Sequence, residues 1–276
     1  MQIVGEATAL AQGAGPAGRI AGMERTAVVT GASSGIGAAT ARQLAAAGYQ
    51  VVLTARRLDR LEEVASQIAE AGGAALVHQL DVTDKAAVDA LAATLDRCDV
   101  LVANAGGAIG AETVATGLAA DWRAMYEVNV IGTMLTVQAF LPKLADSGAG
   151  TIVLMGSTAG LISYEGGGGY VAAKHGTHGV AETLRLELSG QPVRVIEIAP
   201  GMVRTDEFAV NRYRGDADKA AAVYAGVAEP LTADDVADSV VWAVTRPAHV
   251  NVDLMVLRPL AQAAQYKVHR VFPDEP

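Results

Sequence analysis

The segment GGGGYVAAKHG, residues 166–176, places four glycines before a tyrosine and a lysine four residues after that tyrosine. Positions four apart share one face of a helix, so Tyr170 and Lys174 are expected to be neighbours. A free phenol has a pKa of about 10, and a nearby ammonium stabilises the phenolate. The two residues are therefore a candidate pair for proton transfer. The alternative is a flexible loop followed by the solvated first turn of a helix.

A third polar group strengthens the first interpretation. Ser157 ends an expected strand in the segment MGSTAG, thirteen residues before Tyr170. A hydroxyl in this place can hydrogen-bond a substrate oxygen and stabilise the charge that develops on it. The three side chains together predict general acid–base chemistry on a small molecule.

These groups need a framework, and from residue 25 onward the chain alternates between apolar runs and helical patterns. A long helix is expected over residues 118–146. Strands that are apolar throughout and alternate with helices indicate a parallel sheet covered on both faces. We predict one doubly wound α/β domain of the Rossmann type over residues 25–258, with helices on both faces of a seven-stranded parallel sheet. The expected strands are TAVVT, QVVLTA, AALVHQL, DVLVANAG, GTIVLMGS, VRVIEIAP and VNVDLMVL.

The two ends of the chain lie outside this pattern. Residues 1–24 are expected to form a poorly ordered extension, in which GAGPAG matches the dinucleotide pattern G-x-G-x-x-G. This match lacks a preceding strand and contains Pro16, so we do not assign it a ligand. Residues 204–230 are expected to cover a substrate. Residues 259–276 form a tail with no evident core role, for which contact with a second subunit is one expectation.

Composition narrows the class of function. The 276 residues carry a net charge of −9 and a pI near 5.0, which argues against a nucleic-acid or anionic-membrane surface. No uninterrupted apolar stretch approaches the roughly 20 residues that span a membrane. The single cysteine, Cys98, is expected to be a buried, inert thiol in a protein of the reducing cytoplasm. The sequence thus favours a cytoplasmic protein that acts on a small molecule.

A glycine turn follows the first expected strand. In VVTGASSGIGAAT, Gly31, Gly35 and Gly37 stand between the strand and a helix, where backbone N–H groups can approach a pyrophosphate. The alternative is an ordinary glycine-rich turn. The spacing G-x-x-x-G-x-G after a threonine resembles the short-chain dehydrogenase/reductase family, and the resemblance extends over residues 25–258.

The resemblance implies an oxidoreductase with four catalytic residues. By its motifs Tyr170 is the acid/base, Ser157 orients the substrate carbonyl, and Lys174 binds the nicotinamide ribose and lowers the pKa of Tyr170. Asn129, in YEVNVIGT, matches the family residue that holds a water in the proton relay. The alternative for Asn129 is a structural hydrogen bond.

The resemblance also assigns a cofactor-binding set. ANAG matches the family motif N-N-A-G except at Ala103, while LDV resembles the segment that contacts adenine through Asp81. The segment IAPGMVRT follows the sixth strand, where the family binds the carboxamide. The assigned residues are Gly31, Ser33, Ser34, Gly35, Ile36, Gly37, Arg56, Arg57, Asp81, Val82, Asn104, Ala105, Gly106, Tyr170, Lys174, Pro200, Gly201, Val203 and Thr205.

The end of the second strand indicates which nicotinamide cofactor is used. An NAD enzyme places a carboxylate there, but this chain has Ala55 followed by Arg56 and Arg57. A guanidinium binds a 2′-phosphate with charge-assisted hydrogen bonds, and Ser33 can add a hydroxyl. We therefore predict NADP(H). The alternative is two solvated arginines, which must explain cations at a helix N-terminus where the helix dipole disfavours them.

The substrate is suggested by a further resemblance. FAVNRYRGDADKA and the segment after it are similar to NADP-dependent 3-hydroxy acid dehydrogenases of the serine/allo-threonine type. A substrate carboxylate would then pair with Arg212 or Arg214. The alternatives are a surface helix with alternating charges, a reductase of bulkier ketones or aldehydes, and a catalytically silent NADP-binding module.

Two further expectations concern metals and assembly. His175 and His178 stand on the same helix as Tyr170, but no carboxylate partner or metal-ligand spacing is expected for them, so we predict no metal. The family resemblance implies a homo-oligomer, a dimer or a tetramer.

Overall fold

The computed structural model describes residues 25–272, and the GAGPAG match at residues 13–18 lies outside them. The predicted seven-stranded sheet is confirmed. All its strands run parallel in the order β3-β2-β1-β4-β5-β6-β7. Its strands are β1 (Thr26–Thr30), β2 (Gln50–Ala55), β3 (Ala74–Gln79), β4 (Val100–Ala103), β5 (Gly150–Met155), β6 (Val193–Pro200) and β7 (Leu254–Leu257).

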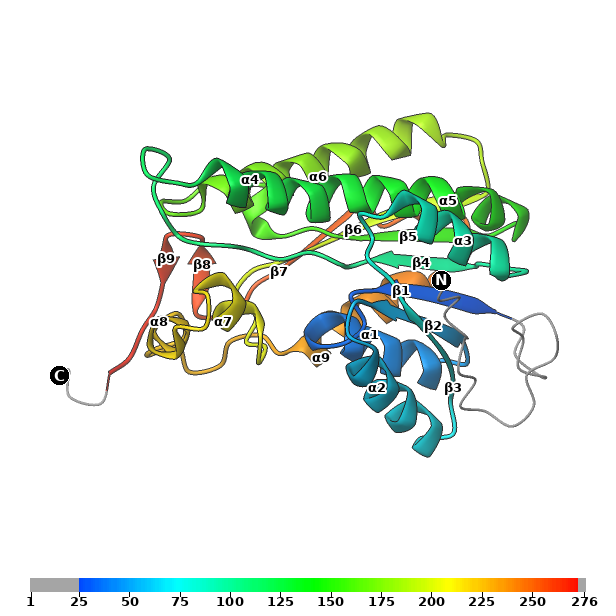
Figure 1. Ribbon diagram of the computed structural model, residues 1–276, viewed down its shortest axis with the longest axis horizontal. Helices are drawn as coiled ribbons and strands as arrows, with labels where there is room; N and C mark the ends of the chain where they lie inside the picture. Colours follow the sequence, from blue (N-terminus) through cyan, green and yellow to red (C-terminus); the bar gives the residue numbers. More distant parts are fainter. Residues whose placement is uncertain (1–24, 273–276) are drawn as a thin grey trace, which may run out of the picture.

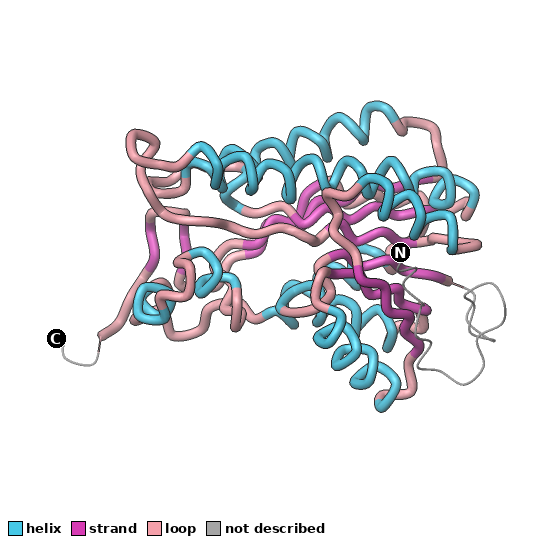
Figure 2. The backbone as a smooth tube through the Cα atoms, viewed as in Figure 1, coloured by secondary structure: helices cyan, strands magenta, loops and turns pink. Residues whose placement is uncertain are grey.

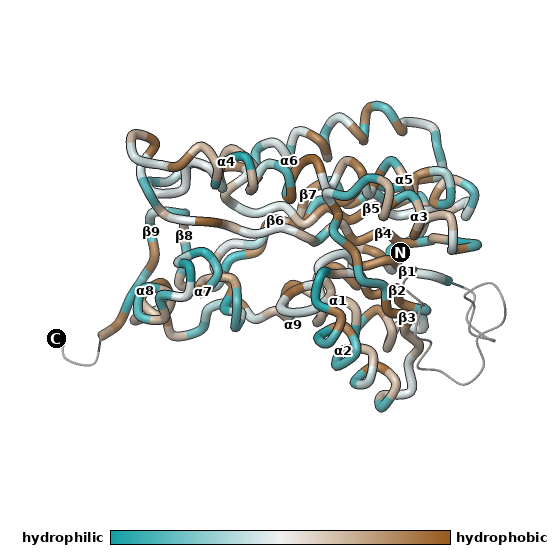
Figure 3. The backbone as a smooth tube through the Cα atoms, in the orientation of Figure 1, coloured by the Kyte–Doolittle hydropathy of each residue, from teal (hydrophilic) through white to brown (hydrophobic). Residues whose placement is uncertain are grey.

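Helices cover both faces of this sheet, as Figure 1 shows. One face carries α1 (Gly35–Ala46), α2 (Leu58–Glu70) and α9 (Ala233–Val244), whose apolar residues share one core cluster with the strands. The other face carries α3 (Lys85–Thr94), α5 (Gly132–Asp146) and α6 (Gly168–Glu187), which build a second cluster. The sheet is apolar on both faces because both are buried, and Figure 3 places hydrophobic residues along the central strands.

The helix expected over residues 118–146 is continuous but not uniform. It consists of α4 (Ala119–Tyr126), a π-helical turn (Glu127–Ile131) and α5. By length and apolar composition alone, residues 119–146 resemble a membrane-spanning helix. Here the helix packs on the sheet, with Phe140 and Leu144 fully buried. The run is thus a core helix of this fold.

The strand order reverses direction between β1 and β4, since the chain runs outward from β1 to β3 and returns to β4 beside β1. Such a switch point opens a crevice at the carboxyl ends of the strands. Figure 2 shows long loops extending beyond that end of the sheet. They carry α7 (Phe208–Arg212) and α8 (Ala217–Ala222), which lie in the segment expected to cover a substrate.

The C-terminal tail contains a second, small sheet. Residues 262–268 form a two-stranded antiparallel hairpin, β8 (Gln262–Ala264) and β9 (Lys267–Val268). Figure 1 shows the hairpin near α7 and α8, beyond the carboxyl end of the main sheet. The tail therefore lies against its own domain and helps to shape the crevice.

Candidate active site

One cavity of about 770 Å³ occupies the crevice at the carboxyl ends of the strands. Loops after β1, β2, β3, β4, β5 and β6 all contribute to its wall, which explains why residues far apart in the sequence meet there. Every predicted catalytic and cofactor-binding residue lines this cavity. Of the two predicted substrate arginines, Arg212 lines it and Arg214 does not.

The glycine turn between β1 and α1 forms one end of the cavity. Gly31 has a φ of 65°, a conformation that favours glycine. A Cβ on Gly37 would lie 2.2 Å from the carbonyl oxygen of Gly31 and 2.5 Å from Nδ2 of Asn104. The turn is thus too tight for a side chain, and it brings the N-terminus of α1 to the cavity. This is the environment that a pyrophosphate requires.

Asn104 secures the same turn from the neighbouring strand. Its Nδ2 donates to the carbonyl of Thr30 at 2.9 Å, while the Thr30 hydroxyl accepts from the backbone N–H groups of Asn104 and Ala105, both at 2.9 Å. Ala103, where the sequence departs from the family motif, is the buried last residue of β4. The turn is therefore held by the asparagine that matches the motif.

Two arginines and Asp81 stand at the rim of this end. Arg56 and Arg57 follow β2 and both line the cavity, and the Nη2 of Arg57 donates to the Ser33 hydroxyl at 3.0 Å. Across the rim, a hydrogen bond from the Thr83 backbone lowers the pKa of Asp81, whose Oδ1 also accepts from the Thr83 hydroxyl. The arginines and Ser33 are placed as a 2′-phosphate site requires.

Tyr170, Lys174 and Ser157 lie at the other end of the cavity. As expected from their spacing, Tyr170 and Lys174 stand together on α6, with Nζ of Lys174 5.9 Å from the centre of the Tyr170 ring. Nζ donates to the carbonyl of Met155 at 2.8 Å, which ties the helix to the end of β5. Ser157 follows β5 and accepts from the backbone N–H of Ala159 at 3.1 Å. The three side chains therefore converge from two elements.

Burial controls the pKa of Tyr170 in this structure. Burial raises the pKa of Tyr170 above its ordinary value, and the opposing groups are Ser157, through a hydrogen bond, and Arg212, through its charge. The lowering of this pKa by Lys174 stays a prediction. Burial also lowers the pKa of Lys174 to about 8, against the charge of Glu197, which raises it. The phenol is thus neutral around neutral pH in this structure and suited to donate a proton.

Asn129 lies in the π-helical turn and is buried. Its Nδ2 donates to the carbonyls of Met125 at 2.8 Å and Gly107 at 3.0 Å, and its Oδ1 accepts from the backbone N–H of Gly107 at 3.3 Å. π-Turns interrupt the regular helix ladder and are frequent at functional sites. The structural hydrogen bonds are therefore present, and the water-holding role of Asn129 stays a prediction.

His178 on α6 corrects the expectation that it has no carboxylate partner. His178 does have a carboxylate partner: its Nδ1 lies 2.7 Å from Oε2 of Glu197, a fully buried residue of β6. Oε1 of Glu197 has no hydrogen-bond partner among residues 25–272. No motif predicts this pair, because the two residues meet only when α6 packs on β6. Within the described part of the chain, no group of three or more His, Cys, Asp or Glu side chains is placed to hold a metal.

The loop after β6 is fixed from three sides. The Thr205 hydroxyl accepts from the backbone N–H of Phe208 at 3.3 Å, and the carbonyl of Val203 accepts from the Tyr224 hydroxyl at 2.9 Å. Gln262 of the C-terminal hairpin accepts from the backbone N–H of Met202 at 2.8 Å. Together with Gln265 it lines the cavity. Sequence reasoning missed both glutamines, because strands of two or three residues carry no detectable periodicity.

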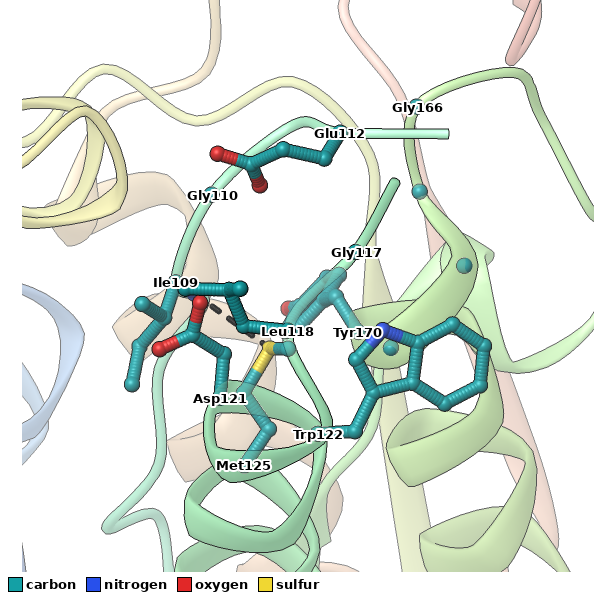
Figure 4. Close-up of a pocket in the computed structure, with 13 residues that line it drawn as sticks. Ile109, Gly110, Glu112, Gly117, Leu118, Asp121, Trp122, Met125, Gly166 and Tyr170 are labelled. Carbon is teal, nitrogen blue, oxygen red and sulfur yellow. Dashed lines mark hydrogen bonds between the residues drawn. The ribbon is translucent and has the colours of Figure 1, made fainter. Parts of the chain in front are cut away.

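The glycine run before Tyr170 is closely packed, as Figure 4 shows for the small recess beside it. A Cβ on Gly167 would lie 2.6 Å from the ring of Tyr164, and one on Gly168 would lie 2.8 Å from the ring of Trp122. A Cβ on Gly169 would lie 2.4 Å from the methyl carbon of Met125. The run therefore permits close approach of α4 and the Tyr164 loop to α6, which differs from the loop flexibility considered for it.

The structure also separates the two predicted substrate arginines. Arg214 pairs with Asp121 at 2.5 Å and is not among the residues that line the cavity. Arg212 donates to the Tyr164 hydroxyl at 3.0 Å and to the carbonyls of Gly166 at 3.0 Å and Gly110 at 3.1 Å. These three acceptors are neutral, and no ion pair forms on Arg212 within residues 25–272. Its charge therefore remains available beside Tyr170.

The fold and this cavity define a class: an α/β protein with a glycine turn for a dinucleotide at one end and a Tyr–Lys–Ser group at the other. Comparison with known proteins gives the family. Residues 25–214 match the family model described as short chain dehydrogenase. The chain belongs to the short-chain dehydrogenase family, as its motifs predicted.

Individual relatives cover nearly the whole domain. An uncharacterized oxidoreductase of Mycobacterium tuberculosis is 54% identical over 241 residues, 87% of this chain and 93% of the relative. An NADP-dependent 3-hydroxy acid dehydrogenase of Escherichia coli is 37% identical over 248 residues, which are 88% of this chain and 98% of the relative. The solved closed form of serine dehydrogenase complexed with NADP⁺ is 36% identical, with a TM-score of 0.82. The match covers 89% of this chain and 100% of that structure.

Proposed function

We propose that this chain is an NADP(H)-dependent oxidoreductase that transfers hydride between nicotinamide and a small 3-hydroxy acid or the corresponding carbonyl compound. One observation carries the proposal: a single cavity joins Arg56, Arg57 and Ser33 to Ser157, Tyr170 and Lys174. NADP is the cofactor named for the relatives at 37% and 36% identity, and the residues of this cavity fit it.

The side chains of the cavity divide the chemistry between them. Bound nicotinamide supplies or accepts the hydride. Ser157 and Tyr170 hydrogen-bond the substrate oxygen, and Tyr170 donates its proton in reduction or accepts one in oxidation. Lys174, as an ammonium fixed on the Met155 carbonyl, holds positive charge near the phenol, and this charge favours the phenolate against the effect of burial.

Arg212 supports a substrate that bears a carboxylate. Its guanidinium is positioned by three neutral acceptors, so its orientation is fixed while its charge is not neutralised. A fixed guanidinium fork suits a planar carboxylate better than a flexible ammonium does. A 3-hydroxy acid would place its carboxylate on Arg212 and its hydroxyl between Ser157 and Tyr170.

The proposed function is tested by following NADPH oxidation and NADP⁺ reduction with a panel of substrates in matched pairs, with and without a carboxylate. We expect turnover of 3-hydroxy acids and loss of at least about 1,000-fold in kcat for Tyr170→Phe, with NADPH binding nearly unchanged. A preference for bulky uncharged ketones would replace the substrate class. Binding of NADPH with no turnover across the panel would support a silent binding module.

Arg212→Gln tests the carboxylate contact, with Tyr164→Phe as the matched control because it removes one acceptor and keeps the charge. We expect Arg212→Gln to raise KM about 10- to 100-fold for the acid and little for its uncharged partner. Equal losses for both substrates in Arg212→Gln would mean that Arg212 only holds the loops together.

We also infer a cytoplasmic location and self-association. Cys98 is buried and burial raises the pKa of its thiol, which supports an inert cysteine of a reducing compartment. The edge strand β7 exposes Leu254 and Val256, which supports contact with a second copy. Fractionation of cells that produce the protein tests the location.

A further inference from the structure

An ion pair spans the phosphate end of the cavity. Nη1 and Nη2 of Arg57 donate to the two carboxylate oxygens of Glu207, each at 2.7 Å. The Ser34 hydroxyl donates to Oε2 of Glu207 at 2.9 Å, and Nη2 of Arg57 also reaches the hydroxyls of Ser33 and Ser34. The guanidinium fork is thus occupied by a carboxylate in bidentate geometry.

The position of this pair distinguishes it from ordinary surface bridges. Arg57 directly precedes α2 and Glu207 directly precedes α7, 150 residues later, and both line the cavity. Their side chains are 42% and 30% exposed, so the bond contributes little to folding stability. A bidentate contact that matters little for folding, at a proposed ligand site, calls for a functional explanation.

The chemistry of the Arg57 guanidinium supplies a functional explanation for the ion pair. Carboxylates and phosphates bind the same planar edge of a guanidinium, and two anions on one fork repel each other. The hydrogen bond from Arg57 lowers the pKa of Glu207, so the carboxylate is ionised at neutral pH. A 2′-phosphate that uses Arg57 and the Ser33 hydroxyl must therefore take the place of this carboxylate.

We propose that Glu207 is a specificity-determining residue: a resident anion on the Arg57 fork that the 2′-phosphate of the cofactor displaces. The inference rests on the proposed NADP(H) function. Displacement sets how tightly a phosphate-bearing dinucleotide binds, because the Arg57–Glu207 bonds are lost in exchange. It also frees the start of α7, where Phe208 contacts the Tyr170 ring edge-on at 5.8 Å.

The test measures binding of two adenosine fragments without any turnover. Adenosine 2′,5′-bisphosphate carries the 2′-phosphate and 5′-AMP lacks it, and titration calorimetry gives Kd for both. For Glu207→Gln we expect Kd for the bisphosphate to fall about three- to fivefold, the upper part of the range that an exposed ion pair provides. Kd for 5′-AMP is expected to stay within about twofold.

Glu63→Gln is the matched control, because Glu63 pairs with the neighbouring Arg60 on α2 at 2.9 Å and its loss changes the net charge equally. It should leave both constants unchanged. An unchanged bisphosphate Kd in Glu207→Gln overturns the inference, and so does a weaker one, which would show that Glu207 holds Arg57 in place for the phosphate.

Arg57→Ala separates this inference from the proposed cofactor. If the wild-type protein prefers the bisphosphate and Arg57→Ala removes that preference, the NADP(H) assignment holds whatever Glu207→Gln does. If the wild-type protein binds both fragments equally and Arg57→Ala changes neither, the cofactor assignment itself fails. Thermal unfolding of each variant verifies that it is folded.

Discussion

At the scale of single residues, the site contains a group whose charge opposes folding. Lys174 is buried, and the carbonyl of Met155 accepts a hydrogen bond from its ammonium. Burial lowers the pKa of Lys174 to about 8 although Glu197 opposes the change. The difference from an exposed lysine corresponds to about 3 kcal/mol of unfolding free energy lost at neutral pH. Function and stability therefore conflict at this residue.

Lys174→Met should abolish turnover and yet stabilise the fold at pH 7 by about 1–2 kcal/mol, after about 1 kcal/mol is subtracted for the hydrogen bond to Met155. Because the folded pKa lies below the unfolded one, the penalty in the wild-type protein is complete below about pH 8 and disappears as the pH rises toward 10.5. The advantage of the variant should shrink over that window.

Urea unfolding of both proteins at about pH 7 and pH 10 measures this difference. Lys85→Met is the control, since Lys85 is 62% exposed on α3 and pairs with Asp89. Its effect should be small and nearly independent of pH. Equal destabilisation by Lys174→Met at both pH values would contradict the account.

Residue types and their order predicted which side chains gather in the cavity, because each motif is local to one strand end or one helix. The partners of these side chains were not predictable. Glu207 meets Arg57, and Glu197 meets His178, only through the packing of distant elements. Burial likewise decides the pKa of Tyr170, and burial is a property of the assembled cavity.

At the scale of elements, the approach of α4 to α6 depends on residues without side chains. Trp122 on α4 lies against Gly168 and Gly169 at the start of α6, directly before Tyr170. The position of the phenol is thus set by a helix contact as well as by its own helix. Catalysis is sensitive to displacements of about 1 Å at such groups.

Gly168→Ala should therefore reduce kcat/KM by about tenfold or more and destabilise the fold by about 1–2 kcal/mol, because the added methyl meets the rigid Trp122 ring. Gly179→Ala is the control on the same helix, where a Cβ meets no atom within 4 Å. That change should stabilise the fold by up to about 1 kcal/mol and leave kinetics unchanged. Kinetics and thermal unfolding of both variants decide the matter, and equal behaviour would show that the contact is dispensable.

Elements with strong periodicity were predicted well, and irregular ones were not. The seven strands follow apolar runs and were all identified. The π-turn at Asn129 was not, since one extra residue in a helix leaves no mark on its apolar pattern. Asp84 caps α3 by accepting from the Ala87 N–H, and this single hydrogen bond leaves no periodic pattern in the sequence.

At the scale of the whole molecule, one edge of the sheet exposes apolar side chains. β7 is an edge strand that pairs with β6 alone, and its Leu254 and Val256 are 38% and 40% exposed on one side. Exposed apolar side chains on an unpaired strand favour association with another chain unless they are covered. Trp242 on α9 is also 46% exposed. These features support a symmetric contact through the β7 edge.

Leu254→Lys combined with Val256→Lys should then lower the mass of the protein in solution, because a twofold contact brings the added charges of two copies together. Light scattering after size exclusion measures the mass of the wild-type protein and of the variant. Ser66→Lys on the exposed side of α2 adds charge of the same sign away from this edge and should leave the mass unchanged. A wild-type protein that is monomeric at micromolar concentration, or a double variant that keeps the wild-type mass, would show that the β7 edge is not an interface.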